Sequence, residues 1–322
     1  MSHKNDSQAR GPHAAIEAAD EREQFTLELF DVLWDRYRQR VAFVAAYERI
    51  IQETNETFVN DHIAFRTFAS QQPLGGIASI SRIFEALGYQ AAGCYSFHDK
   101  HLNAIHYQHS NPQFPKIFVS ELKIWELSAT AREVILRSLS SHRSPLPAET
   151  LATLTSFEGQ RARERTELLD TLVRQFQELP WNLPEKCDVL TLNEESQYAA
   201  WVLVHGYNAN HFTSLINSHR SEPLNDIEKT IAALRDAGVP MKAEIEGDRG
   251  SKLRQSATEA AVIDVSVTEG GRESQMPWTY AYFELAERGE IVDAATGQRI
   301  RFEGFLGPQA THLFEMTQVK KA

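Results

Sequence analysis

The chain has 322 residues, a formal net charge of -11 and two cysteines. The acidic balance argues against a general binder of nucleic acid or of an anionic membrane, because both require a basic face. No window approaches the roughly 18 apolar residues of a membrane-spanning helix, and Met1 to Glu23 lack the apolar core of a secretory signal. We therefore expect a cytoplasmic protein, and two cysteines are too few for a disulfide framework or a four-thiolate zinc site.

Polar residues 1–22 predict a flexible tail, and the apolar residues that follow recur at helical spacing. They predict two helices, over 24–38 and 40–53. The patterns that come next predict a strand, a helix and three strands in this order: 61–68, 77–87, 89–97, 103–109 and 116–122. Leucine, arginine and glutamate then dominate residues 125–180, which predicts a helical insertion that ends near Pro180.

The second half repeats the order of the first half. An apolar run over 199–216, broken by Gly206, precedes an amphipathic helix over 224–237. Strand patterns then return at 241–245, 260–267 and 280–286. We infer an α+β fold in which two βαβββ modules form a curved mixed sheet with added helices.

These patterns divide the chain into segments of different character. We expect a flexible tail, N-terminal helices, a first module, a helical insertion and a second module with a C-terminal lid, at 1–22, 23–57, 58–124, 125–187 and 188–322.

Strand alternation places a histidine and an arginine on one face of the strand over 61–68. Side chains at i, i+2 and i+4 share a face, so His62 and Arg66 point one way and Phe65 points the other way. A metal ligand beside an anion-binding arginine would explain these polar side chains. A solvated strand face is the alternative.

Two further residues have the chemistry to complete a metal site with His62. His211 occupies the matching position in the second half, and Glu284 is a carboxylate within an otherwise apolar or aromatic strand. Burial of a carboxylate is unfavourable unless it is paired or bound to metal. Two histidines and one carboxylate are the elements of a facial triad, which favours Fe(II), although other divalent ions also fit. An exposed glutamate on an edge strand is the alternative.

Paired βαβββ modules with these residues resemble the vicinal oxygen chelate superfamily. The strings DHIAFRTF, NHFT and YFELAERG further resemble the 2-oxoadipate dioxygenase/decarboxylase family, also called hydroxyglutarate synthase, over about 58–314. The spacing Phe283-Glu284-x-x-x-Arg288 is similar to the iron-bearing strand of 4-hydroxyphenylpyruvate dioxygenase. Gly304 and Phe305, followed by a closing helix with Leu313 and Phe314, match the order of the C-terminal lid of that enzyme.

The resemblance implies that His62, His211 and Glu284 bind Fe(II) and that Arg66 is the catalytic arginine that binds a substrate carboxylate. It implies a second anion contact through Arg254 in the loop over 250–256, where a solvated basic loop is the alternative. The implied reaction uses dioxygen to convert a 2-oxo acid, 2-oxoadipate, to 2-hydroxyglutarate and carbon dioxide. A metal-dependent isomerase, lyase or hydrolase and a non-catalytic module that binds metal or a small ligand are the alternatives. We expect no nucleic-acid or membrane partner.

Other polar residues near these strands have weaker signals. Glu121 is interpreted as the first-half counterpart of Glu284, either as a fourth ligand, as an acid beside the ligands or as an ordinary strand residue. Asp61 faces the side of its strand opposite His62, which predicts a structural role. Four histidines crowd one hairpin, where alternation should scatter them rather than form a zinc site: His98, His101, His106 and His109.

Overall fold

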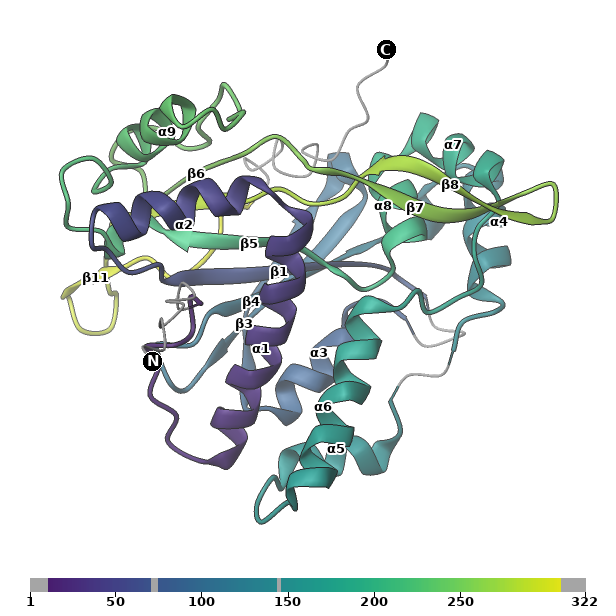
Figure 1. Ribbon diagram of the computed structural model, residues 1–322, viewed down its shortest axis with the longest axis horizontal. Helices are drawn as coiled ribbons and strands as arrows, with labels where there is room; N and C mark the ends of the chain where they lie inside the picture. The colour runs from purple at the N-terminus through teal and green to yellow at the C-terminus, as the bar shows by residue number, and fades with distance from the viewer. Residues whose placement is uncertain (1–10, 71–74, 144–145, 308–322) are drawn as a thin grey trace, which may run out of the picture.

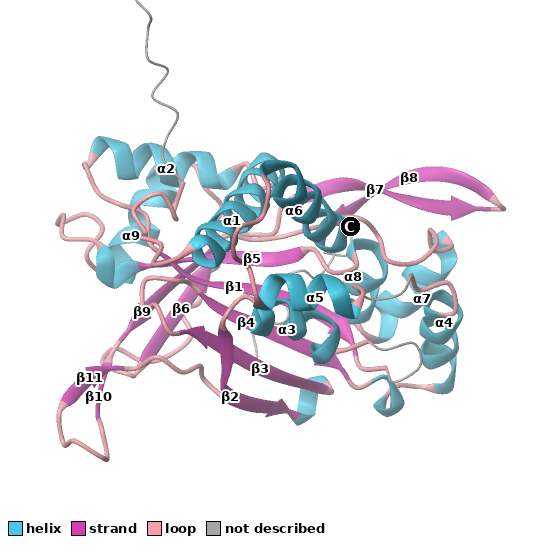
Figure 2. Cartoon of the chain, turned by 90° about the horizontal axis from the view of Figure 1, so that it is seen from below, coloured by secondary structure: helices cyan, strands magenta, loops and turns pink. Residues whose placement is uncertain are grey.

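The computed structural model describes residues 11–70, 75–143 and 146–307. Within these residues, seven strands form one mixed sheet in the order β2-β3-β4-β1-β5-β9-β6 (Figures 1 and 2). Its strands are β1 (Asn60–Phe68), β2 (Tyr89–Phe97), β3 (Leu102–His109), β4 (Lys116–Leu122), β5 (Ala209–Leu215), β6 (Leu253–Ala257) and β9 (Glu284–Arg288).

The two halves of the chain meet at the centre of the sheet. There β1 and β5 pair antiparallel, with Ala64 opposite His211 and His62 opposite Thr213. Each of these strands also pairs in parallel with the last sheet strand of its own half, β1 with β4 and β5 with β9. This related arrangement of the halves confirms the predicted α+β fold with a curved mixed sheet.

Helices α1 (Glu21–Arg40), α3 (Ile77–Ala86) and α6 (Ala162–Gln177) cover the face of the sheet opposite the one that bears His62 (Figure 2). The rings of Phe84 and Phe176 lie 5.4 and 5.1 Å from Phe65, and Trp34 lies 5.1 Å from Phe212. Because neighbouring residues of a strand face opposite ways, this apolar layer leaves the other face for polar side chains. The helices are α1 (Glu21–Arg40), α2 (Phe43–Glu53), α3 (Ile77–Ala86), α4 (Ala129–Leu139), α5 (Ala148–Thr155), α6 (Ala162–Gln177), α7 (Lys186–Glu195), α8 (Gln197–His205) and α9 (Ile227–Asp236).

The first half follows the predicted order, but the second half departs from it. The segment predicted as a strand over 241–245 makes one isolated bridge, from Met241 to Thr258 next to β6, and β6 itself lies where a loop was expected. The apolar run over 199–204 is the buried helix α8, because a short run that is apolar on all sides does not distinguish helix from strand. The strand expected over 280–286 begins only at Glu284.

The strand predicted over 260–267 leaves the central sheet. It is β7 (Val262–Glu269), which pairs with β8 (Arg272–Thr279) in a separate hairpin that packs against α7 and α8 (Figure 1). Gly270 and Gly271 both have positive φ, which a tight two-residue hairpin turn requires. The alternation therefore identified a strand but not the sheet that it joins. A second small hairpin consists of β10 (Glu290–Val292) and β11 (Arg299–Arg301).

The described part of the predicted tail over 1–22 is anchored to the body. His13 is buried, and its ring nitrogens lie 3.0 Å from Asp31 and 3.1 Å from Asn60. The side chain of Asp20 accepts the N–H of Glu23 and so caps α1. This helix begins at Glu21, within the predicted tail. Across the described residues, no helix combines the length and the apolar character needed to cross a membrane.

Candidate metal centre

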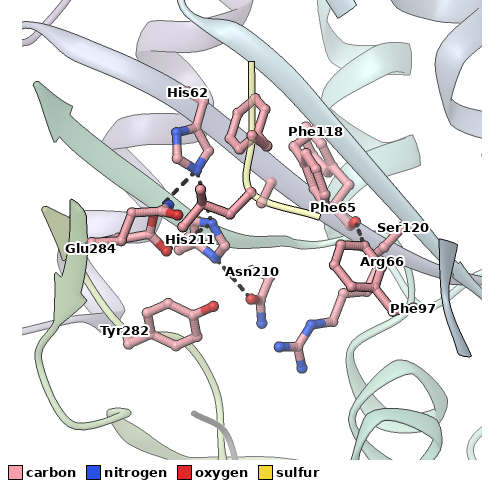
Figure 3. A pocket seen from close by; sticks show the side chains of 14 residues that line it. His62, Phe65, Arg66, Phe97, Phe118, Ser120, Asn210, His211, Tyr282 and Glu284 are labelled. Atoms are coloured by element: carbon pink, nitrogen blue, oxygen red, sulfur yellow. Dashed lines mark hydrogen bonds and ion pairs between the residues drawn. The ribbon is translucent and has the colours of Figure 1, made fainter. Parts of the chain in front are cut away.

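Three donor atoms converge on the face of the sheet opposite α1, α3 and α6 (Figure 3). His62 lies on β1, His211 on β5 and Glu284 at the start of β9. Nε2 of His62 is 3.3 Å from Nε2 of His211 and 3.3 Å from Oε1 of Glu284, and Nε2 of His211 is 3.4 Å from Oε2 of Glu284. The antiparallel pairing of β1 with β5 brings His62, from the first half of the chain, next to His211, from the second half.

The donor set fits a divalent metal ion. Imidazole nitrogens and a carboxylate suit the first-row transition metals, and three protein ligands leave coordination positions open. Oε2 of Glu284 is buried and has no hydrogen-bond partner within the described structure. Such an atom is unfavourable unless a hydrogen-bond donor or a cation satisfies it, and a metal ion held by the three donors would do so. Within the described residues, His62, His211 and Glu284 form the only cluster of at least three such side chains close enough to hold one ion.

Each histidine is oriented by the residue that precedes it. Nδ1 of His62 lies 2.8 Å from Oδ2 of Asp61, and Nδ1 of His211 lies 3.0 Å from Oδ1 of Asn210. An oxygen acceptor at Nδ1 places the hydrogen of a neutral imidazole there, so the Nε2 lone pair is free to bind metal.

Asp61 therefore has a role that strand alternation did not reveal. Arg288 donates to it twice, from Nε to Oδ1 over 2.6 Å and from Nη2 to Oδ2 over 2.7 Å. Burial opposes ionisation, but Arg288 and Lys116 hold the pKa of Asp61 well below its usual range. The ionised carboxylate can thus accept the Nδ1 hydrogen of His62. The sequence signal was its position directly before a candidate ligand.

The two histidines differ in their electrostatic surroundings. Burial lowers the pKa of His211 to about 3, so this imidazole is neutral at physiological pH. Burial also opposes the charged form of His62, but hydrogen bonds and charge from Asp61 and Glu284 outweigh it and raise the pKa of His62. Burial raises the pKa of Glu284, but its interactions with His211, His62 and Gln255 outweigh burial and the net shift is downward. Glu284 is therefore ionised, as a metal ligand must be.

Two further residues hold Glu284 and were not predicted. Nε2 of Gln255 donates to Oε1 of Glu284 over 2.6 Å, and the hydroxyl of Thr213 lies 3.4 Å from the same oxygen. Thr213 Oγ1 is also 3.1 Å from Nε2 of His62. Gln255 lies on β6, which the sequence pattern did not identify as a strand, so its alternation was not available as a signal.

The donors open onto a pocket with aromatic walls. Arg66 is buried, and its guanidinium faces the rings of Tyr198 at 5.0 Å and Trp201 at 5.3 Å. It reaches toward the side of the pocket where Asn210 and Tyr282 lie (Figure 3). The lining residues are His62, Ala64, Phe65, Arg66, Phe97, Phe118, Ser120, Asn210, His211, Gln255, Tyr282, Glu284, Phe305 and Leu306.

The structure does not bring Arg254 to this pocket. Its Nη2 donates to Glu228 over 2.5 Å and its Nη1 to Glu287 over 3.4 Å, and it is absent from the lining residues. The reason is the alternation of β6, on which Gln255 faces the pocket and its neighbour Arg254 faces away.

Glu121 also lies elsewhere, and its interpretation as the counterpart of Glu284 is wrong. Ala64 lies two residues after His62 and pairs with Phe118, whereas Thr213 lies two residues after His211 and pairs with Glu284. Phe118 is therefore the equivalent of Glu284. Oε2 of Glu121 instead accepts the N–H of Ile77 over 2.9 Å, at the start of α3.

The hairpin histidines are scattered, as strand alternation predicted. His101 pairs with Glu126, His106 bonds to the Tyr95 hydroxyl, and His109 stacks on a phenylalanine ring. The predicted closing helix with Leu313 and Phe314 lies outside the described residues.

The two related halves share one site, which is the arrangement expected from the resemblance to the vicinal oxygen chelate superfamily. A family model described as 2-oxoadipate dioxygenase/decarboxylase matches residues 28–306. The chain belongs to this family and is an enzyme, which confirms the resemblance found in its motifs.

Curated relatives support the same assignment. The chain is 28% identical over 279 residues to the chloroplastic 2-oxoadipate dioxygenase/decarboxylase of Arabidopsis thaliana, which covers 80% of this chain and 67% of the relative. A chloroplastic/amyloplastic protein of the same description from Oryza sativa subsp. japonica is 29% identical over 277 residues, with 80% and 68% covered.

Solved structures share the fold. A putative glyoxalase superfamily protein from Ralstonia eutropha JMP134 has a TM-score of 0.76 at 23% identity, with 89% of this chain and 87% of that chain covered. The hydroxyglutarate synthase from Oryza sativa, solved in complex with 2-oxoadipate, has a TM-score of 0.73 at 24% identity, with 96% and 97% covered. A putative hydrolase from Shewanella frigidimarina NCIMB 400 has a TM-score of 0.65 at 29% identity, with 87% and 97% covered.

Proposed function

We propose that this enzyme binds Fe(II) through His62, His211 and Glu284 and converts 2-oxoadipate and dioxygen to 2-hydroxyglutarate and carbon dioxide. The observation that carries the proposal is the convergence of these three donors in a pocket that also contains the buried Arg66. The family supports the reaction, and the rice relative was solved with 2-oxoadipate. The reaction balances, because the six carbons and seven oxygens of 2-oxoadipate plus dioxygen equal those of 2-hydroxyglutarate plus carbon dioxide.

The chain supplies orientation around the ion. Bound Fe(II) supplies the redox chemistry that dioxygen activation requires. Asp61 and Asn210 hold the histidine rings, and Gln255 holds the carboxylate of Glu284. These contacts keep the donors in place before metal and substrate arrive, which reduces the reorganisation that binding requires.

Arg66 is proposed to bind the carboxylate of the substrate that lies away from the 2-oxo group. The protein carries a net charge of -11, so its overall field does not attract a dianion and a local cation must do so. The planar guanidinium of Arg66 can contact both oxygens of a carboxylate, and Tyr198 and Trp201 stabilise its position from the ring faces. This contact would select a dicarboxylic 2-oxo acid.

The proposal is tested with protein loaded with Fe(II) without oxygen and then supplied with 2-oxoadipate in an oxygen electrode. We expect one carbon dioxide released for each dioxygen consumed. His62→Ala and Glu284→Ala should lose both metal retention and turnover, whereas His101→Ala, on the exposed hairpin, should keep both. Full iron content in His62→Ala would disprove the ligand assignment. Conversion of 2-oxoadipate without oxygen consumption would disprove the oxygenase and favour a lyase or isomerase.

A further inference from the structure

Arg288, the last residue of β9, is a buried side chain with partners in two separate parts of the chain. Its Nε and Nη2 hold the carboxylate of Asp61, which in turn accepts from Nδ1 of His62. Its Nη1 donates to the backbone carbonyls of Phe302 over 3.0 Å and Gly304 over 2.8 Å. One guanidinium therefore contacts both the support of a candidate metal ligand and a segment near the C-terminus.

That segment, residues 302–306, is here called the C-terminal strap. It places Phe305 in the pocket, where the ring meets the His62 ring edge to face at 4.8 Å and 87°. The N–H of Phe305 donates to the Tyr95 hydroxyl over 3.0 Å, and its ring also lies 5.2 Å from the Arg288 guanidinium. The strap thus forms a wall of the pocket directly beside the candidate ligand.

A second ion pair also ties the strap to the sheet. Nζ of Lys116 lies 2.6 Å from Glu303, and Lys116 is itself close enough to Asp61 to lower its pKa. The anchors of the strap and the charged group behind His62 therefore belong to one connected network. In such a network, loss of one partner leaves other buried charges unsatisfied, so its members are not independent.

We propose that Arg288 is a positioning residue that couples metal binding at His62 to the seating of the C-terminal strap. The guanidinium can satisfy Asp61 and both strap carbonyls only in one place and orientation, because its donors form a rigid planar fork. Displacement of the strap would remove two acceptors from a buried cation and so disturb the carboxylate that orients His62. By linkage, metal at His62 should favour the seated strap by the same factor by which the seated strap favours metal.

This inference rests on the proposed metal site, and it is tested without substrate. Co(II) serves as a spectroscopic probe of the ion, and its affinity is measured for the wild type and Arg288→Gln. Hydrogen exchange by mass spectrometry follows peptides that span 302–306, with and without Co(II). We expect Co(II) to slow strap exchange in the wild type. In Arg288→Gln we expect Co(II) affinity to fall about 10–100-fold, strap exchange to be faster and Co(II) no longer to slow it.

Further variants separate coupling from general loss of structure. Arg165 also makes a bidentate contact, with Glu28 on α1, but lies on α6 outside the pocket, so Arg165→Gln should leave both readouts unchanged. Arg288→Lys keeps the positive charge but lacks the fork, and should show the same uncoupling if Arg288→Gln does not fold. Exchange in α1 and α3 reports whether each variant retains its fold.

Unchanged Co(II) affinity in both Arg288 variants would overturn the proposal. Strap exchange that is insensitive to Co(II) in the wild type, or equally protected by it in the variants, would also overturn it. These outcomes differ from failure of the proposed function. A protein that binds Co(II) through His62 and protects its strap, yet does not turn over 2-oxoadipate, would retain the coupling and contradict only the substrate.

Discussion

Gln255 donates a hydrogen bond from Nε2 to Oε1 of Glu284 over 2.6 Å, from β6 to the neighbouring strand β9. Both side chains are buried. The bond holds one carboxylate oxygen and leaves Oε2 at 3.4 Å from Nε2 of His211, without a hydrogen-bond partner within the described structure. A carboxylate that is oriented in this way needs less rearrangement to bind a metal ion.

Gln255→Leu removes this donor while keeping a side chain of similar size. We expect metal affinity to fall by about 10-fold, because ligand-supporting contacts are typically worth 10–100-fold in affinity. The measurement is competition for Fe(II) or Co(II) against a chelator. Gln275→Leu on the exposed β8 hairpin is the matched control, since Gln275 bonds only to Ser266 among described partners and should not affect the metal. Equal affinity in the wild type and Gln255→Leu would contradict the role.

Arg66→Lys keeps a positive charge but lacks the planar fork that lies against Tyr198 and Trp201. We expect the KM for 2-oxoadipate to rise roughly 10–100-fold, which corresponds to the loss of a charge-assisted hydrogen bond, while metal affinity stays unchanged. For a 2-oxo acid without a second carboxylate, the same substitution should raise the KM much less. Arg40→Ala is the control, because Arg40 lies over the Tyr280 ring outside the pocket. An equal rise in KM for both classes of substrate would show that Arg66 does not bind the second carboxylate.

Glu121→Ala tests the corrected position of this carboxylate. Its Oε2 accepts the N–H of Ile77 at the first turn of α3, and Gly76, the cap residue, has no side chain to do so. We expect the free energy of unfolding to fall by about 1 kcal/mol, as for loss of a helix cap, with metal stoichiometry unchanged. Urea unfolding and metal analysis measure the two effects. Loss of metal from Glu121→Ala would instead support its role as a ligand.

His205 should make stability depend on pH. Burial lowers its pKa to about 3, and its Nε2 lies 2.8 Å from the carbonyl of Thr279. Between the folded pKa and the ordinary value near 6.5, the unfolded chain binds a proton that the folded protein does not bind, so stability falls as pH falls. From pH 7.5 to pH 5, the wild type should lose roughly 2 kcal/mol more than His205→Gln, which keeps an N–H donor and does not titrate.

Urea unfolding of both proteins at the two pH values measures this difference. Parallel losses in the wild type and His205→Gln would show that His205 is not the group responsible. The test is separate from the metal centre, because the partner of His205 is the backbone of Thr279 next to α8.

Strand alternation in the sequence was sufficient to predict that His62 and Arg66 share a face, because this periodicity is local to one strand. The repeated order of elements also predicted that His211 and Glu284 would lie near His62, and the structure brings these three donors together. Their binding of Fe(II) remains a prediction. The resemblance also implied an anion contact through Arg254, but this side chain faces away from the pocket because it lies on β6, a strand that the sequence pattern did not identify.

Only the tertiary structure revealed the residues that support the site. Asp61 and Arg288 lie 227 positions apart in the chain, and Gln255 and Glu284 lie 29 apart, so no periodic pattern relates them. The register between β1 and β4 makes Phe118, rather than Glu121, the equivalent of Glu284. This register is likewise set by pairing across the sheet rather than by either strand alone. Local sequence determined which faces carry polar chemistry here. Packing between distant strands decided which of those side chains meet, because side-chain contact depends on three-dimensional register.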